Sequence, residues 1–418
     1  MNRILFFSFV CAFFFLIDLY VFQAVKSLFN DMAGGTRKLL YILYWSVTVL
    51  SIAGFLTYNL GGKAHIGREM RTLIFTLIFV NYFSKIFGVV FLMLDDIGRV
   101  FRWAFQHIRG TEPSTAVAES GSGISRSEFL VKASLVATAV PAMAMGYGII
   151  SGAHDYRIRR KTVYLPNLPA SFDGIRIAQL SDIHSGSFFN KTAVSGGIDM
   201  LLAEKPDVVF FTGDLVNDRA EEVKEYQDVF AKVKAPLGVF STLGNHDYGD
   251  YFHWPSADAK RRNLQDLIRV HKQMGWDILM NENRIIREGG EQLAILGIEN
   301  WGTGGFAQYG RLDLAHQGTD EAAVKILLSH DPSHWDAQVR PQYPDIDLMF
   351  AGHTHGMQFG IEVGDFKWSP VQYRYKQWAG LYQQENQYLY VNRGYGYLVF
   401  PGRIGMPPEI TILELKKA

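Results

Sequence analysis

The sequence predicts an α/β domain with a central sheet, preceded by an all-α transmembrane block. Long apolar runs occupy the first 150 residues, and from about His154 short β-rich runs alternate with helix-like stretches. Such alternation is typical of α/β domains. With 418 residues the chain is longer than one typical domain. We therefore expect a membrane block at residues 1–150 and an α/β domain at residues 155–418.

The membrane block contains about four segments of the length that a spanning helix needs. About 20 predominantly apolar residues cross a bilayer, and residues 4–25, 39–60 and 73–94 meet this condition. Residues 131–150 form a fourth, less hydrophobic candidate. Residues 95–108 have helical periodicity and are expected to lie in the membrane interface. A cleaved signal peptide would not be followed by further hydrophobic runs, so we predict a multi-pass integral membrane protein.

The side of the membrane is harder to predict. Basic residues are almost equally numerous on the two sides of the predicted spans, so the positive-inside rule does not decide. Residues 125–130, with the sequence SRSEFL, precede the fourth span and resemble a twin-arginine export signal with one arginine in place. This resemblance favours an extracytoplasmic α/β domain. Asp18 and Lys85 lie within predicted spans and leave a transporter as an alternative.

Composition narrows the kinds of site to consider. The formal net charge is zero, so nothing in the overall charge favours a nucleic-acid partner, and we expect none. The single cysteine, Cys11, excludes an intrachain disulfide framework and a metal site built from cysteines.

The α/β domain is predicted from runs of β-branched and aromatic residues between amphipathic stretches. Strands are expected at residues 176–180, 207–211, 238–242, 278–280, 284–287, 293–298, 323–329, 346–350, 387–391 and 410–415. Helices are expected at residues 192–204, 221–232 and 263–274.

Polar side chains that can bind metals follow five of these strands. In α/β sheets, ligands bind at the carboxyl ends of the strands, and side chains two residues apart in extended chain point to the same side. The side chains are Asp182 and His184, Asp214, Asn245 with His246 and Asp247, His330, and His353 with His355.

The donor set predicts a centre with two metal ions. Carboxylate, amide oxygen and imidazole together suit Mn, Fe, Zn or Co, whereas calcium prefers oxygen alone. Leaving out His246 and Asp247, the donors exceed the needs of one tetrahedral site, so two ions sharing one carboxylate fit better. Two ions about 3.5–4 Å apart lower the pKa of a bridging water and hold a phosphoryl oxygen, which gives a hydroxide that can attack phosphorus.

These motifs resemble those of the calcineurin-like metallophosphoesterase superfamily, whose series is D-x-H, G-D, G-N-H-D/E, H and G-H-x-H. All five occur in order between residues 182 and 355, and the resemblance covers roughly residues 160–415. It implies a central β-sandwich flanked by helices. It also implies roles for the residues: Asp182, His184 and His355 bind one metal, Asn245, His330 and His353 bind the other, Asp214 bridges both, His246 acts on the leaving oxygen, and Asp247 orients the His246 ring.

The resemblance implies a membrane-anchored, metal-dependent phosphohydrolase, more a phosphodiesterase than a monoesterase. Its substrate is expected at the membrane, as a lipid-linked phosphate or a nucleotide-sugar diphosphate. The alternative is a catalytically inactive membrane receptor or scaffold that uses the same fold. One departure concerns Met357, which stands where many relatives have a second glycine after G-H-x-H, and which could change substrate access.

Some residues near the motifs have two interpretations. Arg393 and Arg403 are possible phosphate contacts or ordinary surface arginines. Residues 366–382 place aromatic residues among Lys and Arg, which suits either a loop at lipid headgroups or a loop covering the sheet edge. His271 and His334 lie outside the motifs and are interpreted as surface or turn residues.

Overall fold

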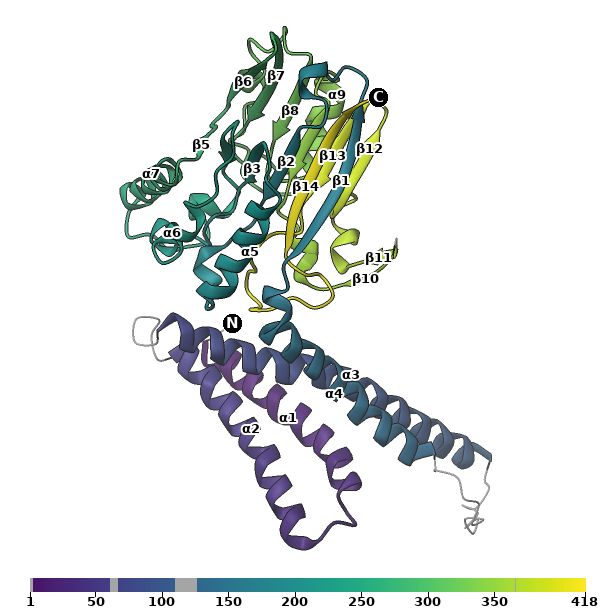
Figure 1. Ribbon diagram of the computed structural model, residues 1–418. Helices are drawn as coiled ribbons and strands as arrows, with labels where there is room; N and C mark the ends of the chain where they lie inside the picture. The colour runs from purple at the N-terminus through teal and green to yellow at the C-terminus, as the bar shows by residue number, and fades with distance from the viewer. Residues whose placement is uncertain (1–2, 61–66, 110–125, 365) are drawn as a thin grey trace. The chain divides into compact units, whose positions relative to one another are not determined.

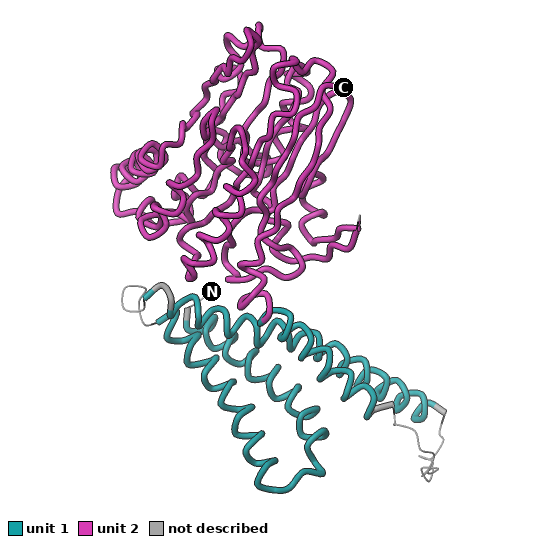
Figure 2. The backbone as a smooth tube through the Cα atoms, viewed as in Figure 1, with its two compact units in different colours: residues 1–146 teal, residues 147–418 magenta. Residues whose placement is uncertain are grey.

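The computed structural model describes residues 3–60, 67–109, 126–364 and 366–418. The chain forms two compact units, residues 1–146 and residues 147–418 (Figure 2). We call the first the membrane block and the second the sheet unit.

Four long helices make up the described part of the membrane block. Each is long and apolar enough to cross a bilayer, so the protein is a multi-pass membrane protein. Residues 95–108 are helical, as expected, and they continue the third helix because no proline separates them from the span. The helices are α1 (Arg3–Leu28), α2 (Gly34–Leu60), α3 (Arg68–Arg109) and α4 (Arg126–Ile150) (Figure 1).

A buried ion pair links α1 to α3 within the membrane block. Lys85 Nζ contacts one carboxylate oxygen of Asp18, and the Tyr82 hydroxyl donates to the other oxygen at 2.9 Å. The Tyr44 hydroxyl donates to the Asp18 carbonyl at 2.8 Å, and Lys85 Nζ lies 4.7 Å from the centre of the Tyr44 ring. Both carboxylate oxygens of Asp18 therefore have partners inside the block.

Two six-stranded sheets form the sheet unit. The first has the order β1 (Arg157–Leu165), β14 (Glu409–Lys417), β2 (Arg176–Leu180), β3 (Val208–Thr212), β4 (Val239–Thr242) and β5 (Asp277–Ile278). The second has the order β12 (Gly380–Gln384), β13 (Gln387–Val391), β9 (Leu348–Ala351), β8 (Val324–Leu328), β7 (Glu291–Gly297) and β6 (Glu282–Glu288). A separate hairpin consists of β10 (Ile361–Val363) and β11 (Phe366–Trp368).

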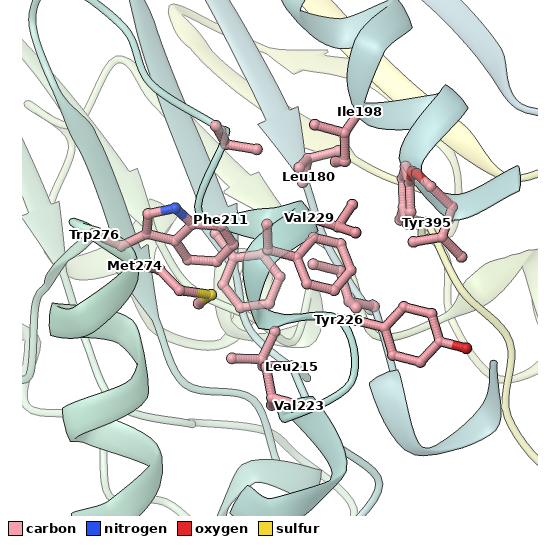
Figure 3. Packing of buried hydrophobic residues seen from close by; sticks show 14 of the residues in the cluster. Leu180, Ile198, Phe211, Leu215, Val223, Tyr226, Val229, Met274, Trp276 and Tyr395 are labelled. Carbon is pink, nitrogen blue, oxygen red and sulfur yellow. The ribbon is translucent and has the colours of Figure 1, made fainter. Parts of the chain in front are cut away.

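The two sheets pack face to face, and helices cover their outer faces. Successive side chains of β3 point to opposite faces of the sheet. Val208 and Phe210 face the second sheet, whereas Val209 and Phe211 face the helices. The helical side of the first sheet is covered by α5 (Lys191–Ala203), α6 (Gln227–Phe230) and α7 (Ala257–Met274), and Figure 3 shows part of this core. The second sheet is covered by α8 (Leu312–Ala315) and a π-helix (Trp335–Val339), after which the short α9 (Arg340–Gln342) follows. The predicted sandwich flanked by helices, preceded by an all-α block, is confirmed.

Parallel pairing brings the carboxyl ends of the central strands together. Strands β2, β3 and β4 pair in parallel, and so do β7, β8, β9 and β13 in the second sheet. The Gln179 amide of β2 donates to the Ala351 carbonyl of β9 at 2.9 Å, which joins the two sheets at this edge. The loops after these strands therefore share one region.

Some elements differ from the sequence-based expectation. Strand β1 was not predicted because its sequence, RIRRKTVYL, is rich in charge, yet it is an edge strand whose basic side chains bind carboxylates. Arg160 pairs with Glu204 and Arg159 with Glu362. The helix predicted at residues 221–232 is instead a 3₁₀ turn (Ala220–Val223) followed by the short α6.

Candidate metal centre

The five predicted motif segments come together at the shared edge of the two sheets. Each follows one strand: β2, β3, β4, β8 or β9. The geometry brings their donors into two adjoining clusters, in each of which the ligand atoms lie within 4.8 Å of one another. One cluster is Asp182, His184 and His355, and the other is Asp214, His330 and His353.

The first cluster, which we call triad 1, places three donor atoms around one point. His184 Nε2 lies 3.0 Å from His355 Nε2, and His355 Nε2 lies 3.2 Å from Asp182 Oδ1. All three side chains are buried. Two ring nitrogens at this distance need either a proton or a cation between them, and a carboxylate beside them favours a cation.

The second cluster, triad 2, includes an amide oxygen as well. His353 Nδ1 lies 3.3 Å from His330 Nε2 and 2.9 Å from Asn245 Oδ1. Asp214 Oδ2 lies between the triads, 3.2 Å from His330 Nε2 and 3.5 Å from His184 Nε2. The donor set of the two triads, with one carboxylate between them, fits a dinuclear centre of divalent cations.

The backbone is strained at most of these ligands. Asp182, His184, Asp214, His353 and His355 all have φ between 50° and 70°, a region that residues other than glycine rarely adopt. Such outliers cost about 1–3 kcal/mol each and gather at functional sites. The surrounding fold therefore holds the donors in place at a cost to stability.

Two glycines make room for the carboxylates. A Cβ atom at Gly352 would lie 2.1 Å from Asp182 Oδ2, and one at Gly244 would lie 2.2 Å from Asp214 Oδ1. The glycines of the G-H-x-H and G-N-H-D motifs are thus required because the ligand carboxylates lie against their backbone.

Burial and mutual attraction set the charge of the cluster. Burial alone would lower the pKa of His330. The attraction of the nearby Asp214 carboxylate is stronger and raises this pKa to about 10. Burial likewise opposes charge on Asp214, yet His330 and His246 hold the pKa of Asp214 well below its ordinary value. Burial holds the pKa of His184 well below its ordinary value, which favours the neutral form of this ring. The carboxylates therefore favour positive charge at the centre.

Further side chains hold the ligands from outside the motifs. The Thr212 carbonyl accepts from His330 Nδ1 at 2.7 Å. His353 Nε2 lies 2.8 Å from the Tyr375 hydroxyl and 3.5 Å from Asp331 Oδ2. The Asn245 amide donates to the Tyr251 hydroxyl at 2.9 Å. Sequence reasoning missed these partners, although Asp331 directly follows the ligand His330.

The predicted partner of His246 is wrong. His246 Nδ1 lies 2.8 Å from the Asn217 carbonyl, which fixes the ring. Asp247 does not contact the ring; its carboxylate accepts backbone N–H groups from Asp214, Leu215, Val216 and Gly244 at 2.8–3.2 Å. Asp247 thus holds the loop that carries Asp214, because four convergent donors are the stronger attraction for a buried carboxylate.

The two candidate phosphate-binding arginines are structural. Arg393 is buried and binds Glu409 at 2.5 Å. Arg403 is fully buried, donates to the carbonyls of Arg393, Gly394, Gly396 and Met406, and lies 3.3 Å from His355 Nδ1. Neither is an open phosphate contact. Arg403 instead supports the His355 ring from behind.

Two histidines expected at the surface are buried. His271 of α7 lies 2.9 Å from the Ser241 hydroxyl, and burial lowers its pKa to about 3. His334 lies between Ser329 and Gln338, and burial lowers its pKa to about 4. Both are neutral core residues, since each is enclosed by packed side chains.

The centre lies at the end of the sheet unit where α4 joins it. Strand β1 starts at Arg157, shortly after α4 ends, and β1 runs parallel to β14. Strand β14 is antiparallel to β2, with Thr411 opposite Gln179. The carboxyl end of β2, and hence Asp182, therefore lies where β1 begins (Figure 1).

Fold and donor set together define a metal-dependent hydrolase, because paired cations at a sheet edge serve to activate water and to hold a phosphoryl oxygen. One family model, described as calcineurin-like phosphoesterase, matches residues 175–357. Another, described as the transmembrane domain of a probable calcineurin-like phosphoesterase, matches residues 2–153. The chain belongs to the calcineurin-like metallophosphoesterases, hydrolases of phosphoester bonds, with an N-terminal four-helix transmembrane domain.

Similar proteins include a named transmembrane protein and a named phosphodiesterase. A transmembrane protein with metallophosphoesterase domain from Danio rerio is 28% identical over 363 residues, which cover 84% of this chain and 74% of the relative. Phosphodiesterase YaeI from Escherichia coli is 26% identical over 260 residues, which cover 62% of this chain and 87% of the relative. Among solved structures, the Thermus thermophilus sulfate thiohydrolase SoxB matches with a TM-score of 0.35 and 13% identity, over 60% of this chain and 57% of that chain.

Proposed function

We propose that the protein is a phosphodiesterase acting on a phosphorylated lipid or other bilayer-held phosphodiester, with a nucleotide-sugar diphosphate as the second substrate class. The observation that carries the proposal is the sharing of Asp214 between two adjoining His/Asp triads. Two divalent cations bound there would polarise a phosphoryl oxygen and lower the pKa of a water molecule.

The residues have distinct parts in this scheme. Asp182, His184 and His355 hold one cation, Asn245, His330 and His353 hold the other, and Asp214 serves both. His246 Nδ1 is engaged by the Asn217 carbonyl, so its Nε2 is the nitrogen available to the leaving oxygen. The ring centre of His246 lies 5.0 Å from that of His184, so a substrate at the centre is within its reach. His246 thus protonates the leaving alcohol.

Support for a bilayer-held substrate comes from position. Within the sheet unit the metal centre lies at the end where β1 begins, and the four candidate spans anchor the protein in the bilayer. Support for a diester comes from the similar protein named phosphodiesterase YaeI. Mn, Fe and Zn all suit the donor set.

The test is an Asp214→Asn variant of the full-length protein, assayed on a chromogenic phosphodiester and on a lipid phosphodiester in bilayers. We expect loss of hydrolysis of both, together with a lower content of bound metal. Asp228→Asn removes an exposed carboxylate from the same unit and is the matched control. Full activity of Asp214→Asn, or after complete chelation, would refute the mechanism. A purified protein that binds no metal would favour the receptor or scaffold alternative.

We also propose that the sheet unit is extracytoplasmic, on the basis of the export-signal-like residues 125–130. A reporter fused after Ala418 tests this orientation. A reporter active only in the cytoplasm would overturn it and would leave the proposed chemistry unaffected.

A further inference from the structure

The most exposed aliphatic and phenylalanine side chains of the sheet unit lie on a few neighbouring segments. Seven aliphatic or phenylalanine side chains of this unit, among its described residues, are more than half exposed. Six of them are Ile150, Met357, Ile361, Val363, Phe366 and Val399. The seventh, Phe189, packs against the ring of His154, which follows α4 directly. We call these seven side chains the apolar face.

Hydrogen bonds join the segments that carry the apolar face. The Gln358 amide, beside Met357, donates to the carbonyls of Phe400 and Gly402 at 2.9 and 3.0 Å. The Gly360 N–H, just before β10, donates to the Ile404 carbonyl at 2.9 Å. The segment with Val399 and the hairpin β10–β11 are therefore one connected surface.

The same surface continues onto the last residues of α4, which belong to the sheet unit. The Arg403 N–H donates to the Gly148 carbonyl at 3.1 Å, within the final turns of α4. The span of suitable hydropathy extends from Glu128 to His154, so Ile150 belongs to it. A hollow of about 550 Å³ adjoins these segments, and Tyr147, Arg157 and Glu362 line it. Tyrosine and arginine are side chains that membrane–water interfaces favour.

Two features separate this face from ordinary surface. A soluble surface rarely gathers its exposed apolar residues into one contiguous patch unless the patch binds something. Val399 is 71% exposed, and its φ of 64° is rarely adopted by a β-branched residue. The fold thus holds an apolar side chain outward at an energetic cost.

We propose that the apolar face enters the interfacial layer of the bilayer that α4 crosses. The hairpin β10–β11 and the segment around Val399 then lie at the boundary between headgroups and acyl chains. The bilayer is the occupant because the face continues from a residue of the span itself. The insertion of the apolar face does not depend on catalysis. Its functional consequence rests on the proposed function: an inserted face presents the metal centre to substrates that remain in the membrane.

The direct test measures lipid contact in the full-length protein. Single cysteines replace Val363 or Val399 in a Cys11→Ser background, carry an environment-sensitive fluorophore, and are reconstituted in bilayers with brominated acyl chains. Tyr164→Cys is the matched control, because Tyr164 is exposed but lies at the opposite end of β1. We expect strong quenching at residues 363 and 399 and little at residue 164. Equal quenching at all three positions, or none, would overturn the proposal.

A second copy of the chain is the competing occupant. Cross-linking between Val363→Cys side chains of two copies, without quenching by brominated lipid, would identify the face as a dimer interface and would overturn membrane docking. Lipid quenching without cross-linking supports it.

A functional readout separates this inference from the proposed function. Val363→Ser combined with Phe366→Ser is expected to lower hydrolysis of a lipid phosphodiester in bilayers several-fold, with hydrolysis of a soluble chromogenic phosphodiester unchanged. Equal loss on both substrates would contradict selective presentation. Quenching at residues 363 and 399 in a protein that hydrolyses neither substrate would refute the proposed function and leave docking supported.

Discussion

The membrane block and the sheet unit each bury charged side chains, and they do so differently. Asp18 and Lys85 neutralise one another, and both oxygens of Asp18 have donors. In triad 1 two imidazole nitrogens and a carboxylate instead converge: His184 Nε2 lies 3.0 Å from His355 Nε2, next to the Asp182 carboxylate. The ion pair is neutralised by the chain's own residues, whereas the converging donors of triad 1 suit a bound cation.

This difference separates structural from functional burial of charge. A buried pair that satisfies itself contributes to helix association, and apolar residues of similar size can replace it. A buried cluster of electron-pair donors lowers stability until a bound cation neutralises it. Such a cluster is therefore typical of a binding site. Burial alone would not distinguish the two.

The largest expected effect contrasts the two aspartates. Asp182→Asn should lower bound metal and phosphodiester hydrolysis by more than about 100-fold, since even partners outside the ligand shell change affinity by about 10–100-fold. Asp18→Asn should leave both within a factor of a few. Metal analysis and initial rates on the purified protein measure the two variants side by side. Equal metal loss in both would erase the proposed distinction.

The ion pair should be replaceable as a pair. Asp18→Asn leaves Lys85 buried without its partner and should destabilise the membrane block by about 3 kcal/mol. The double variant Asp18→Leu and Lys85→Met should recover most of that loss. Unfolding in detergent micelles measures both. A double variant no better than the single one would mean that the charges themselves are required, for example along a transport path.

A buried neutral histidine is a third kind of buried polar group, and it should make the stability of the sheet unit depend on pH. Burial lowers the pKa of His271 to about 3 from its ordinary value of 6.5, so below pH 6.5 the unfolded chain binds the proton more readily than the folded protein does. Stability from this residue is complete above pH 6.5 and falls as pH drops toward 3, by about 2 kcal/mol at pH 5.

Unfolding of metal-free protein between pH 7 and 5 measures this loss. His271→Gln keeps a polar side chain beside Ser241 and should flatten the pH dependence. An unchanged slope in that variant would assign the acid sensitivity to other groups.

The smallest effect concerns the outer partners of His353. Tyr375→Phe removes the hydroxyl 2.8 Å from His353 Nε2 and should weaken metal binding at triad 2 by about 10-fold, with triad 1 unaffected. Tyr373→Phe, two residues away and 80% exposed, is the control. Metal titration followed by calorimetry should resolve a weaker and an unchanged site. Equal weakening of both sites would mean that the triads are not independent.

Sequence reasoning predicted the fold class, the spans and most strands, because each depends on local pattern, and the seven donors stay a prediction from the motifs. Spans follow from apolar length, and the donors follow from motifs at strand ends. Strand β1 was missed because its arginines look unlike a strand until Glu204 and Glu362 are seen beside them. The roles of Asp247 and Arg403 depend on which backbone groups surround them, and no sequence pattern encodes that.

Two tyrosines outside the motifs contact the centre, and the sequence did not predict these contacts, although Tyr375 lies in the aromatic stretch 366–382. Tyr251 and Tyr375 contact Asn245 and His353, yet neither lies in a motif. Residues 366–382 contain both buried side chains near the centre and exposed side chains. Trp378 is buried and Tyr375 contacts a ligand, whereas Phe366 is exposed and belongs to the apolar face.

The strand β14 is synthesised last but lies inside the first sheet. It lies between β1 and β2, and its first residue, Glu409, binds Arg393. The ribosome therefore synthesises the spans and every donor of the centre before the strand that joins β1 to the rest of the first sheet. Because β1 pairs only with β14 in the first sheet, this sheet cannot be completed until the last residues of the chain have been added.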